Sequence, residues 1–332
     1  MIKRRVRMVD IARAAEVSQT TVSLVLNQVE GIRIAEDTRH RVLSVARELG
    51  YEPAPALRAF GRAGTKLFGV VIDEISAAYP SNMIDGLQSA AEARATELII
   101  QITGGREDRE AAALENFARL AVAGVIYATT FTRLVQPSTR LDSFPHIFLN
   151  CRRKDKQGLS VLPDERRGGK MAAQHLIDAG CERIATITGD PWQSAARDRF
   201  AGFRQTLQRN GLSADPACVR HGDWGYESGW RSTRELLALE SPPDGLFCQN
   251  DVMARGALTA IEEAGLRVPR DIAVIGYDDR DFAKNLRPPL TTISLPHAEM
   301  AEQALARLTA YPNDRAATAY RVSGSLVMRA SC

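Results

Sequence analysis

The sequence predicts a small all-α head followed by a two-lobed α/β body built on two doubly wound parallel sheets. Over the first fifty of the 332 residues, apolar side chains recur at helical spacing and strand-like alternation is absent. From Lys66 onward, β-branched runs alternate with amphipathic stretches, which is typical of parallel sheets covered by helices. A composition of 45% hydrophobic and 25% charged residues is that of an ordinary globular chain and excludes disordered, collagen-like and coiled-coil classes.

The head is expected to contain three short helices. The first covers residues 10–15, the second follows Ser18 as its N-cap, and the third runs from about Ala35 to Leu49, where Gly50 ends it. The residues expected to face inward are Ile11, Ala12, Ala15, Val22, Val25, Leu26, Val42, Val45, Ala46 and Leu49. Two helices joined by a tight turn match the helix-turn-helix plan of DNA-binding proteins. An ordinary three-helix bundle without a DNA role is the alternative.

The body is expected to divide near Pro163-Asp164 into two lobes. The expected strands are 67–72, 98–103, 124–127, 146–149, 184–189, 245–248 and 272–277, and the expected helices are 81–96, 108–121, 165–179, 197–208, 226–239 and 252–264. In such folds ligands bind beyond the carboxyl ends of the strands, which here means the cleft between the lobes.

The segment that joins head and body is rich in proline and glycine. Residues 51–64 surround a short possible helix over 56–60, which is too short to be stable alone. Such a segment could become ordered only on contact with a partner.

Charge is divided unevenly along the chain. Residues 1–66 contain 12 Lys and Arg against 7 Asp and Glu, whereas the remainder contains 31 against 33. A basic head on a nearly neutral body points to a nucleic-acid contact at the head, although Lys3, Arg4 and Arg5 could be a solvated tail.

Other classes of protein find little support. The five cysteines are scattered without a C-x-x-C pair, which argues against a disulfide framework and a zinc site. No apolar run is long enough for a membrane helix, and the charged N-terminus is not followed by a signal-like apolar region, so a cytoplasmic protein is expected. Phosphate-binding and nucleophile-elbow motifs are missing, which argues against an enzyme, and no cofactor is expected.

Taken together, several motifs resemble the lac repressor/galactose repressor family of bacterial transcription regulators. The matching motifs are Asp10-Ile11-Ala12, residues 17–27 (Val-Ser-x-x-Thr-Val-Ser-x-Val-Leu-Asn), Glu48-Leu49-Gly50-Tyr51-x-Pro53, residues 249–257 (Gln-Asn-Asp-x-Met-Ala-x-Gly-Ala), Gly276-Tyr277-Asp278-Asp279 and residues 287–292. The resemblance implies a periplasmic-binding-protein-like body and four parts: a head over 1–50, a hinge with a short helix over 51–65, a first lobe over 66–164 plus about 296–322, and a second over 165–295 plus about 323–332.

The resemblance also implies a homodimer whose heads bind half-sites of a near-palindromic operator. The DNA-contacting positions it implies are Ser18, Gln19, Thr20, Thr21, Ser23, Leu24, Asn27, Arg39, Leu57 and Phe60. Base reading is expected to rest on Gln19 and Thr20, while Leu24 stands where the family commonly has an arginine and can make only apolar contacts. Phe60 would wedge into the minor groove, or alternatively pack against the body. Two departures from the family are Glu16 at its turn glycine and Ala35 at its N-cap serine.

For the body, the resemblance implies an effector site between the lobes. The positions it implies are Asp73, Tyr79, Tyr127, Asn150, Arg199, Trp224, Asn250, Asp278 and His297. A neutral sugar is the expected effector, with a nucleobase as the minority alternative, because acidic residues offset the single clear arginine and Trp224 suits the apolar face of a sugar ring. Trp224 could instead be a core residue, and Arg199 and Asp278 could form a salt bridge between lobes without a ligand.

The expected mechanism is a population shift in which the effector alters the spacing of the hinge helices and hence operator affinity. A repressor without an effector and an exported solute-binding protein are the remaining alternatives. No leucine heptads follow the last strand, so a dimer rather than a coiled-coil tetramer is expected.

Overall fold

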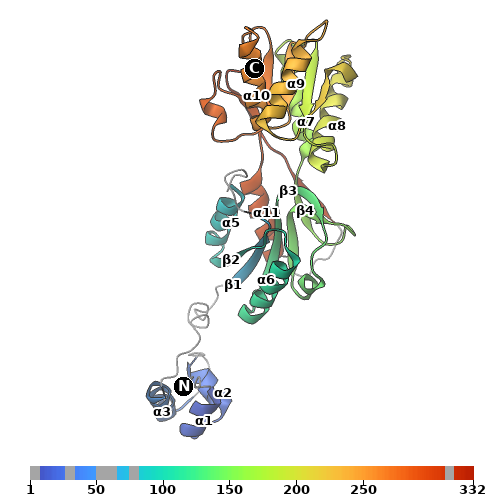
Figure 1. Cartoon of the computed structure of the whole chain (residues 1–332). Helices are drawn as coiled ribbons and strands as arrows, with labels where there is room; N and C mark the ends of the chain where they lie inside the picture. Colours follow the sequence, from blue (N-terminus) through green and yellow to red (C-terminus); the bar gives the residue numbers. More distant parts are fainter. Residues whose placement is uncertain (1–7, 27–33, 50–65, 75–81, 311–317) are drawn as a thin grey trace. The chain divides into compact units, whose positions relative to one another are not determined.

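The computed structural model describes residues 8–26, 34–49, 66–74, 82–310 and 318–332. The chain forms two compact units, residues 1–67 and 68–332, which are described separately below. The described residues 8–26 and 34–49 of the first unit form only helices and the turns between them, and the second unit carries two six-stranded sheets, which confirms the predicted fold class (Figure 1). The expected hinge helix, including Leu57 and Phe60, lies outside the described residues.

The head consists of α1 (Met8–Ala14), α2 (Gln19–Leu26) and α3 (Glu36–Glu48). Its core is formed by Ile11, Ala12, Ala15, Val22, Val25, Val42 and Ala46, all of which the apolar spacing predicted. Leu49 is an error of that prediction, since it is 40% exposed just beyond the last turn of α3. Leu43, which the spacing did not select, packs against the core from the same helix.

Ser18 is the N-cap of helix α2, as the sequence predicted. Its Oγ accepts a hydrogen bond from the backbone N–H of Thr21 at 3.0 Å, which satisfies one of the helix's free donors. The two positions at which the sequence departs from the family that it resembles have visible consequences. Glu16 occupies the turn with φ 54°, a conformation that favours glycine, and Ala35 precedes α3 without a side-chain cap.

The first sheet of the body has the strand order β11-β5-β4-β3-β1-β2. Its strands are β1 (Lys66–Ile72), β2 (Thr96–Ile102), β3 (Gly124–Val135), β4 (His146–Arg153), β5 (Ser160–Pro163) and β11 (Ala319–Val322). The helices α5 (Asn82–Glu92), α6 (Glu107–Leu120) and α11 (His297–Ala310) and the short helix η1 (Thr139–Ser143) accompany it. Strand β3 runs eight residues beyond the expected Tyr127, because its end pairs with β4 again after a register shift between Ala128 and Arg133.

The second sheet has the order β12-β10-β9-β8-β6-β7. Its strands are β6 (Ile184–Thr188), β7 (Val219–His221), β8 (Gly245–Cys248), β9 (Ala273–Asp278), β10 (Thr291–Ser294) and β12 (Leu326–Val327). The helices are α7 (Glu165–Asp178), α8 (Ser194–Arg209), α9 (Tyr226–Leu237) and α10 (Asp251–Glu263), with η2 (Pro216–Cys218) and η3 (Ala283–Asn285) in the connections. The chain passes between the sheets three times, after β5, after β10 and after β11.

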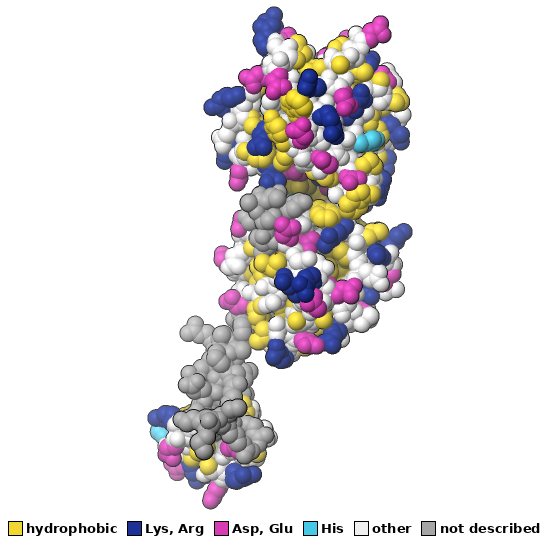
Figure 2. Space-filling view, viewed as in Figure 1, with side chains coloured by type: hydrophobic (Ala, Val, Ile, Leu, Met, Phe, Trp, Pro, Cys, Tyr) yellow, Lys and Arg dark blue, Asp and Glu magenta, His cyan; other side chains and the backbone are white. Residues whose placement is uncertain are grey.

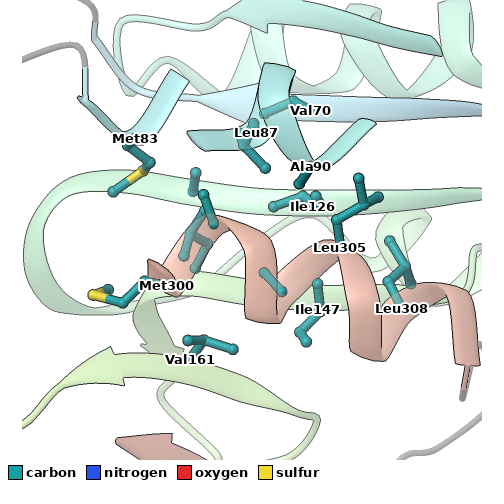
Figure 3. Packing of buried hydrophobic residues seen from close by; sticks show 14 of the residues in the cluster. Val70, Met83, Leu87, Ala90, Ile126, Ile147, Val161, Met300, Leu305 and Leu308 are labelled. Atoms are coloured by element: carbon teal, nitrogen blue, oxygen red, sulfur yellow. The ribbon is translucent and has the colours of Figure 1, made fainter. Parts of the chain in front are cut away.

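Helix α11 joins the core of the first lobe although it follows the second sheet in sequence. Figure 3 shows Leu305 and Leu308 of α11 against Ile126 and Ile147 of the sheet. These four side chains are buried, and Leu87 of α5 belongs to the same cluster. Residues 295–296, where the chain passes from one lobe to the other, therefore lie between strand β10 of the second sheet and a helix that is packed into the core of the first lobe.

The visible face of the body mixes Lys and Arg side chains with Asp and Glu side chains (Figure 2). This mixture agrees with the nearly neutral charge of the body's sequence. The five cysteines are all free thiols. Among the described helices, none combines the length and hydrophobicity that crossing a membrane requires.

Candidate functional site

A cavity of about 420 Å³ lies where the carboxyl ends of both sheets meet. Ile72, Thr130 and Asn150 reach it from the first sheet, Asp278 ends strand β9 of the second sheet, and Asn250 closely follows β8. The other lining residues are Glu74, Met83, Ile84, Phe131, Thr132, Glu165, Gln193, Ala195, Arg199, Asp223, Trp224, Gly225, Val252, Arg280, Leu295 and His297. Its size and its mixture of apolar wall and convergent polar groups are those of a small-molecule site.

Arg199 is the centre of a buried network at this cavity. Its guanidinium forms a bidentate salt bridge with Glu165, in which Nε donates to Oε2 at 2.7 Å and Nη2 donates to Oε1 at 3.0 Å. Nη1 donates to the backbone oxygen of Gln249 and lies 3.7 Å from Oδ1 of Asp278. The Tyr277 ring lies under the guanidinium at 3.6 Å, and its hydroxyl donates to Glu165. Arg199 and Asp278 thus do form an ion pair, but within one lobe rather than between lobes.

Close helix packing sets this network in place. A Cβ atom on Gly169 of α7 would lie 1.9 Å from the backbone oxygen of Arg199, and one on Gly202 of α8 would lie 2.0 Å from the backbone oxygen of Arg166. The glycines therefore let the two helix backbones approach closely. This approach brings Glu165, at the start of α7, within reach of Arg199.

Asp278 is a largely buried carboxylic acid in the cavity lining. Burial raises its pKa to about 7, against the lowering effect of Arg199. Its neighbour in the cavity wall, His297, is neutral in the physiological range because burial lowers its pKa to about 4. A second acid, Asp251, accepts hydrogen bonds from Thr292 Oγ1 and the backbone N–H of Arg280, and burial raises its pKa to about 8.

Because the pKa values of Asp251 and Asp278 are raised in the folded protein, we expect the free energy of unfolding to fall as the pH rises from 6.5 to 8. In this range the folded protein still holds protons on Asp251 and Asp278 that the unfolded chain, with pKa values near 3.8, has already released. By linkage the free energy of unfolding should decrease by about 2 kcal/mol. His297 opposes this decrease slightly, because the unfolded imidazole, with a pKa of 6.5, still releases protons above pH 6.5 whereas the buried imidazole, with a pKa of about 4, is already neutral.

Urea unfolding at several pH values measures this slope. Asp251→Asn removes the acid with the higher pKa, so that variant should lose more than half of the decrease, whatever its absolute stability. A free energy of unfolding that stays constant from pH 6.5 to 8 would contradict the assignment.

Trp224 and Asn250 form one wall of the cavity. Asn250 caps α10 by accepting from the backbone N–H of Met253 at 2.7 Å, and its Nδ2 donates to the backbone oxygen of Trp224 at 2.9 Å. Trp224 is held at φ 70°, and its indole packs against Gly189, where a Cβ would come within 1.8 Å of the ring. A non-glycine residue at positive φ is strained, and such strain is typical of functional sites.

The opposite wall comes from the first lobe. Asn150, at φ 59° and 2% exposed, donates through Nδ2 to the backbone oxygen of Thr129 and accepts from Thr132 Oγ1 at 2.7 Å. Ser194 Oγ of the second lobe donates to the backbone oxygen of Thr132 at 3.4 Å. The two lobes are thus in direct contact at the cavity.

Two residues expected in the cleft lining lie elsewhere, and a third is not described. The Tyr127 hydroxyl donates a hydrogen bond to Glu110 at 2.9 Å, and Tyr127 does not line the cavity. The part of β3 that lines the cavity begins only at Thr130. Asp73 turns away from the cavity to accept from the backbone N–H of Thr130 and from Arg133 at 2.8 Å. Tyr79 lies outside the described residues. The remaining six of the implied positions all line the cavity.

Sequence reasoning missed Glu165, Phe131 and Arg280 in the lining. Glu165 had a usable signal, since it stands at the start of a predicted helix directly after the point where the lobes divide. Phe131 had none, because it belongs to the part of β3 that continues past the register shift.

On the head, Gln19 and Thr20 are exposed in the first turn of α2. Ser23 and Leu24 are half-buried, Arg39 on α3 is half-exposed, and the hydroxyls of Ser18 and Thr21 lie 2.9 Å apart. Asn27 lies outside the described residues. The two residues expected to read bases are thus available at the surface of the helix.

Comparison with known proteins assigns both parts of the chain. Residues 7–54 match the family described as bacterial regulatory proteins, lacI family, and residues 173–332 match the periplasmic binding protein-like domain. The chain is 34% identical to the ribose operon repressor of Escherichia coli (strain K12), over 90% of each chain. It is 30% identical to the transcriptional repressor PurR of Vibrio campbellii, over 89% of this chain and 88% of that protein.

Solved structures give the same result. The lac repressor dimer bound to operator and the anti-inducer ONPF has a TM-score of 0.73 at 28% identity, over 99% of both chains. The complex of the regulator CelR with cellobiose has a TM-score of 0.66 at 27% identity, over 99% of this chain and 100% of that one. With a helix-turn-helix head, a two-lobed ligand cavity and relatives of this similarity, the chain belongs to the lacI family of ligand-responsive, DNA-binding transcription regulators.

Proposed function

We propose that the protein is a repressor whose affinity for operator DNA is controlled by a neutral sugar bound between the lobes of the body. The observation that supports this most strongly is the charge of the cavity. Among the described residues, two arginines and four carboxylic acids line it, and the guanidinium of Arg199 is already engaged by Glu165. A phosphate or carboxylate ligand would therefore meet an excess of acid, whereas hydroxyl groups could donate to Asp278.

The shape of the wall also favours a sugar. Trp224 presents an aromatic surface of the kind that packs against the C–H face of a sugar ring. Asn150, Asn250 and Asp278 supply amide and carboxylate groups around it, which suit the hydroxyl rim of such a ring. Relatives named as ribose operon repressors make D-ribose the first sugar to test, and the similarity to a cellobiose complex adds cellobiose. The PurR relative makes purine bases the alternative class.

Control of DNA binding would follow from a shift between two arrangements of the lobes. A ligand in the cavity touches both lobes, so it favours the arrangement that fits it better. If that arrangement binds operator less well, the ligand is an inducer, and by reciprocity operator weakens ligand binding by the same factor. Release from DNA by the sugar is the direction we propose.

Three further properties complete the proposal. The protein acts as a homodimer on a near-palindromic operator, as the repeated half-sites of such DNA require. It works in the cytoplasm, where the DNA is. It binds its sugar without transforming it, so the sugar should be recovered unchanged after incubation.

Asp278→Asn is the variant that tests the sugar site. Hydrogen bonds from hydroxyl groups to a carboxylate contribute about 1.5–3 kcal/mol, so the variant should bind the sugar roughly ten- to a hundredfold more weakly. A thermal-shift screen of D-ribose, cellobiose and adenine, followed by calorimetric titration of the compounds that bind, measures the change.

Asp281→Asn is the matched control, because Asp281 is exposed three residues along the same loop and does not line the cavity. It should bind the sugar like the unchanged protein. Equal weakening in both variants, or binding of adenine but of no sugar, would contradict the proposal. If none of the screened compounds binds, a repressor without a small-molecule effector would be favoured.

A further inference from the structure

Two large aromatic side chains from opposite lobes meet at the rim of the cavity. Phe131 of the first lobe lines the cavity, and Trp192 precedes Gln193, a lining residue of the second. Their ring centroids are 6.4 Å apart with the planes at 80°. Trp192 is nevertheless 62% exposed, the second most exposed large hydrophobic side chain of the described residues. An indole left so exposed beside a ligand cavity is a feature that needs an explanation.

Charged groups hold the Phe131 ring and the backbone that carries Trp192. The guanidinium of Arg133 lies over the Phe131 ring at 4.9 Å, and Arg133 is itself fixed by its 2.8 Å ion pair with Asp73. On the other lobe, Arg197 Nη1 donates to the backbone oxygens of Pro191 and Trp192. The neighbouring contact between Ser194 and Thr132 ties the two segments together. The backbone on both sides of the rim is thus fixed and the two rings support each other through their edge contact, and preorganisation of this kind reduces the entropy lost on binding.

We propose that the Phe131–Trp192 pair is an outer subsite for a second ring, so that the natural effector is a neutral glycoside rather than a free monosaccharide. Its sugar ring occupies the inner cavity beside Trp224, and its second ring, another sugar or a planar base, lies on the exposed indole of Trp192. Phe131 lines the cavity and Trp192 does not, so a ligand that reaches this pair has to extend from the inner cavity toward the exposed indole, which a two-ring glycoside can do and a single ring cannot. The inference rests on the proposed sugar site.

The test compares each one-ring compound with its two-ring partner. Calorimetric titrations of D-glucose against cellobiose, and of D-ribose against adenosine, are made with the unchanged protein, Trp192→Ala and Trp192→Phe. In one of these two pairs of compounds, the two-ring compound should bind the unchanged protein about tenfold more tightly than its one-ring partner. Trp192→Ala should abolish that gain while leaving the affinity for the one-ring compound unchanged, and Trp192→Phe should keep most of the gain. The pair that responds identifies the second ring as a sugar or a base.

Trp230→Phe is the matched control, since Trp230 lies on α9, where its indole N–H donates to Glu263 and does not line the cavity. One-ring compounds that bind as tightly as their two-ring partners would overturn the subsite and leave the proposed sugar site intact. Equal weakening of both compounds by Trp192→Ala would also overturn it, because the pair would then act only as a contact between the lobes. Failure of all four compounds to bind the unchanged protein would overturn both the subsite and the proposed function.

Discussion

Replacing Arg199 with alanine is expected to lower the free energy of unfolding of the body by about 3–5 kcal/mol. Glu165 is 3% exposed and would lose both hydrogen bonds from the guanidinium, which leaves a buried carboxylate with Tyr277 as its only hydrogen-bond donor among those described above. The Tyr277 ring would also lose the cation that lies 3.6 Å from its centre. Urea unfolding followed by far-ultraviolet circular dichroism measures the loss.

A second variant separates the buried charge from simple loss of packing. Arg199→Met combined with Glu165→Gln removes both charges and keeps much of the side-chain volume. It should therefore be more stable than Arg199→Ala by at least about 2 kcal/mol. If the free energy of unfolding of Arg199→Ala lies within about 1 kcal/mol of that of the unchanged protein, the network around Arg199 does not have the structural role assigned to it.

Replacing Gln19 and Thr20 together with alanine is expected to weaken operator binding by about 2–4 kcal/mol, or roughly thirty- to a thousandfold. Both side chains are exposed in the first turn of α2, the part of a recognition helix that meets base edges. We propose that they read bases rather than phosphates, so affinity for unrelated DNA should barely change. Operator duplexes selected from a random-sequence pool by the unchanged protein provide the substrate for binding titrations.

Arg39→Ala is the contrasting variant for this experiment, because the family resemblance implies that Arg39 contacts a DNA phosphate rather than a base. A side chain that contacts only phosphate should weaken binding to operator and unrelated DNA alike and lower the salt slope by about one. The assignment of base reading to Gln19 and Thr20 would be wrong if the double variant lost affinity for both kinds of DNA equally.

The fold was predictable because its signals are local. Apolar spacing selected every residue of the head's buried core, and alternation of strands with helices indicated two parallel sheets. Short edge strands such as β7 and β12 were not predicted, because three or two residues carry no periodic signal. Helix α11 was also missed, although its apolar stripe is regular.

The site was only partly predictable, because its geometry depends on contacts between distant segments. The resemblance named Arg199, Trp224, Asn250 and Asp278, and all four line the cavity, but the burial of Glu165 against Arg199 depends on how closely α7 and α8 pack. Asp73 shows the opposite error. Its position at the end of β1 is that of a lining residue, yet Arg133 and the backbone of Thr130 draw its carboxylate away.

The central claim is that a ligand in the body controls DNA binding by the head. Fluorescence anisotropy of a labelled operator, titrated with the full-length protein in the absence and presence of a saturating sugar from the screen, tests it most directly. We predict that the sugar weakens operator binding at least about tenfold, and that saturating operator weakens sugar binding by the same factor. An operator affinity that is unchanged when the sugar is bound would show that the two sites are uncoupled and would contradict the account.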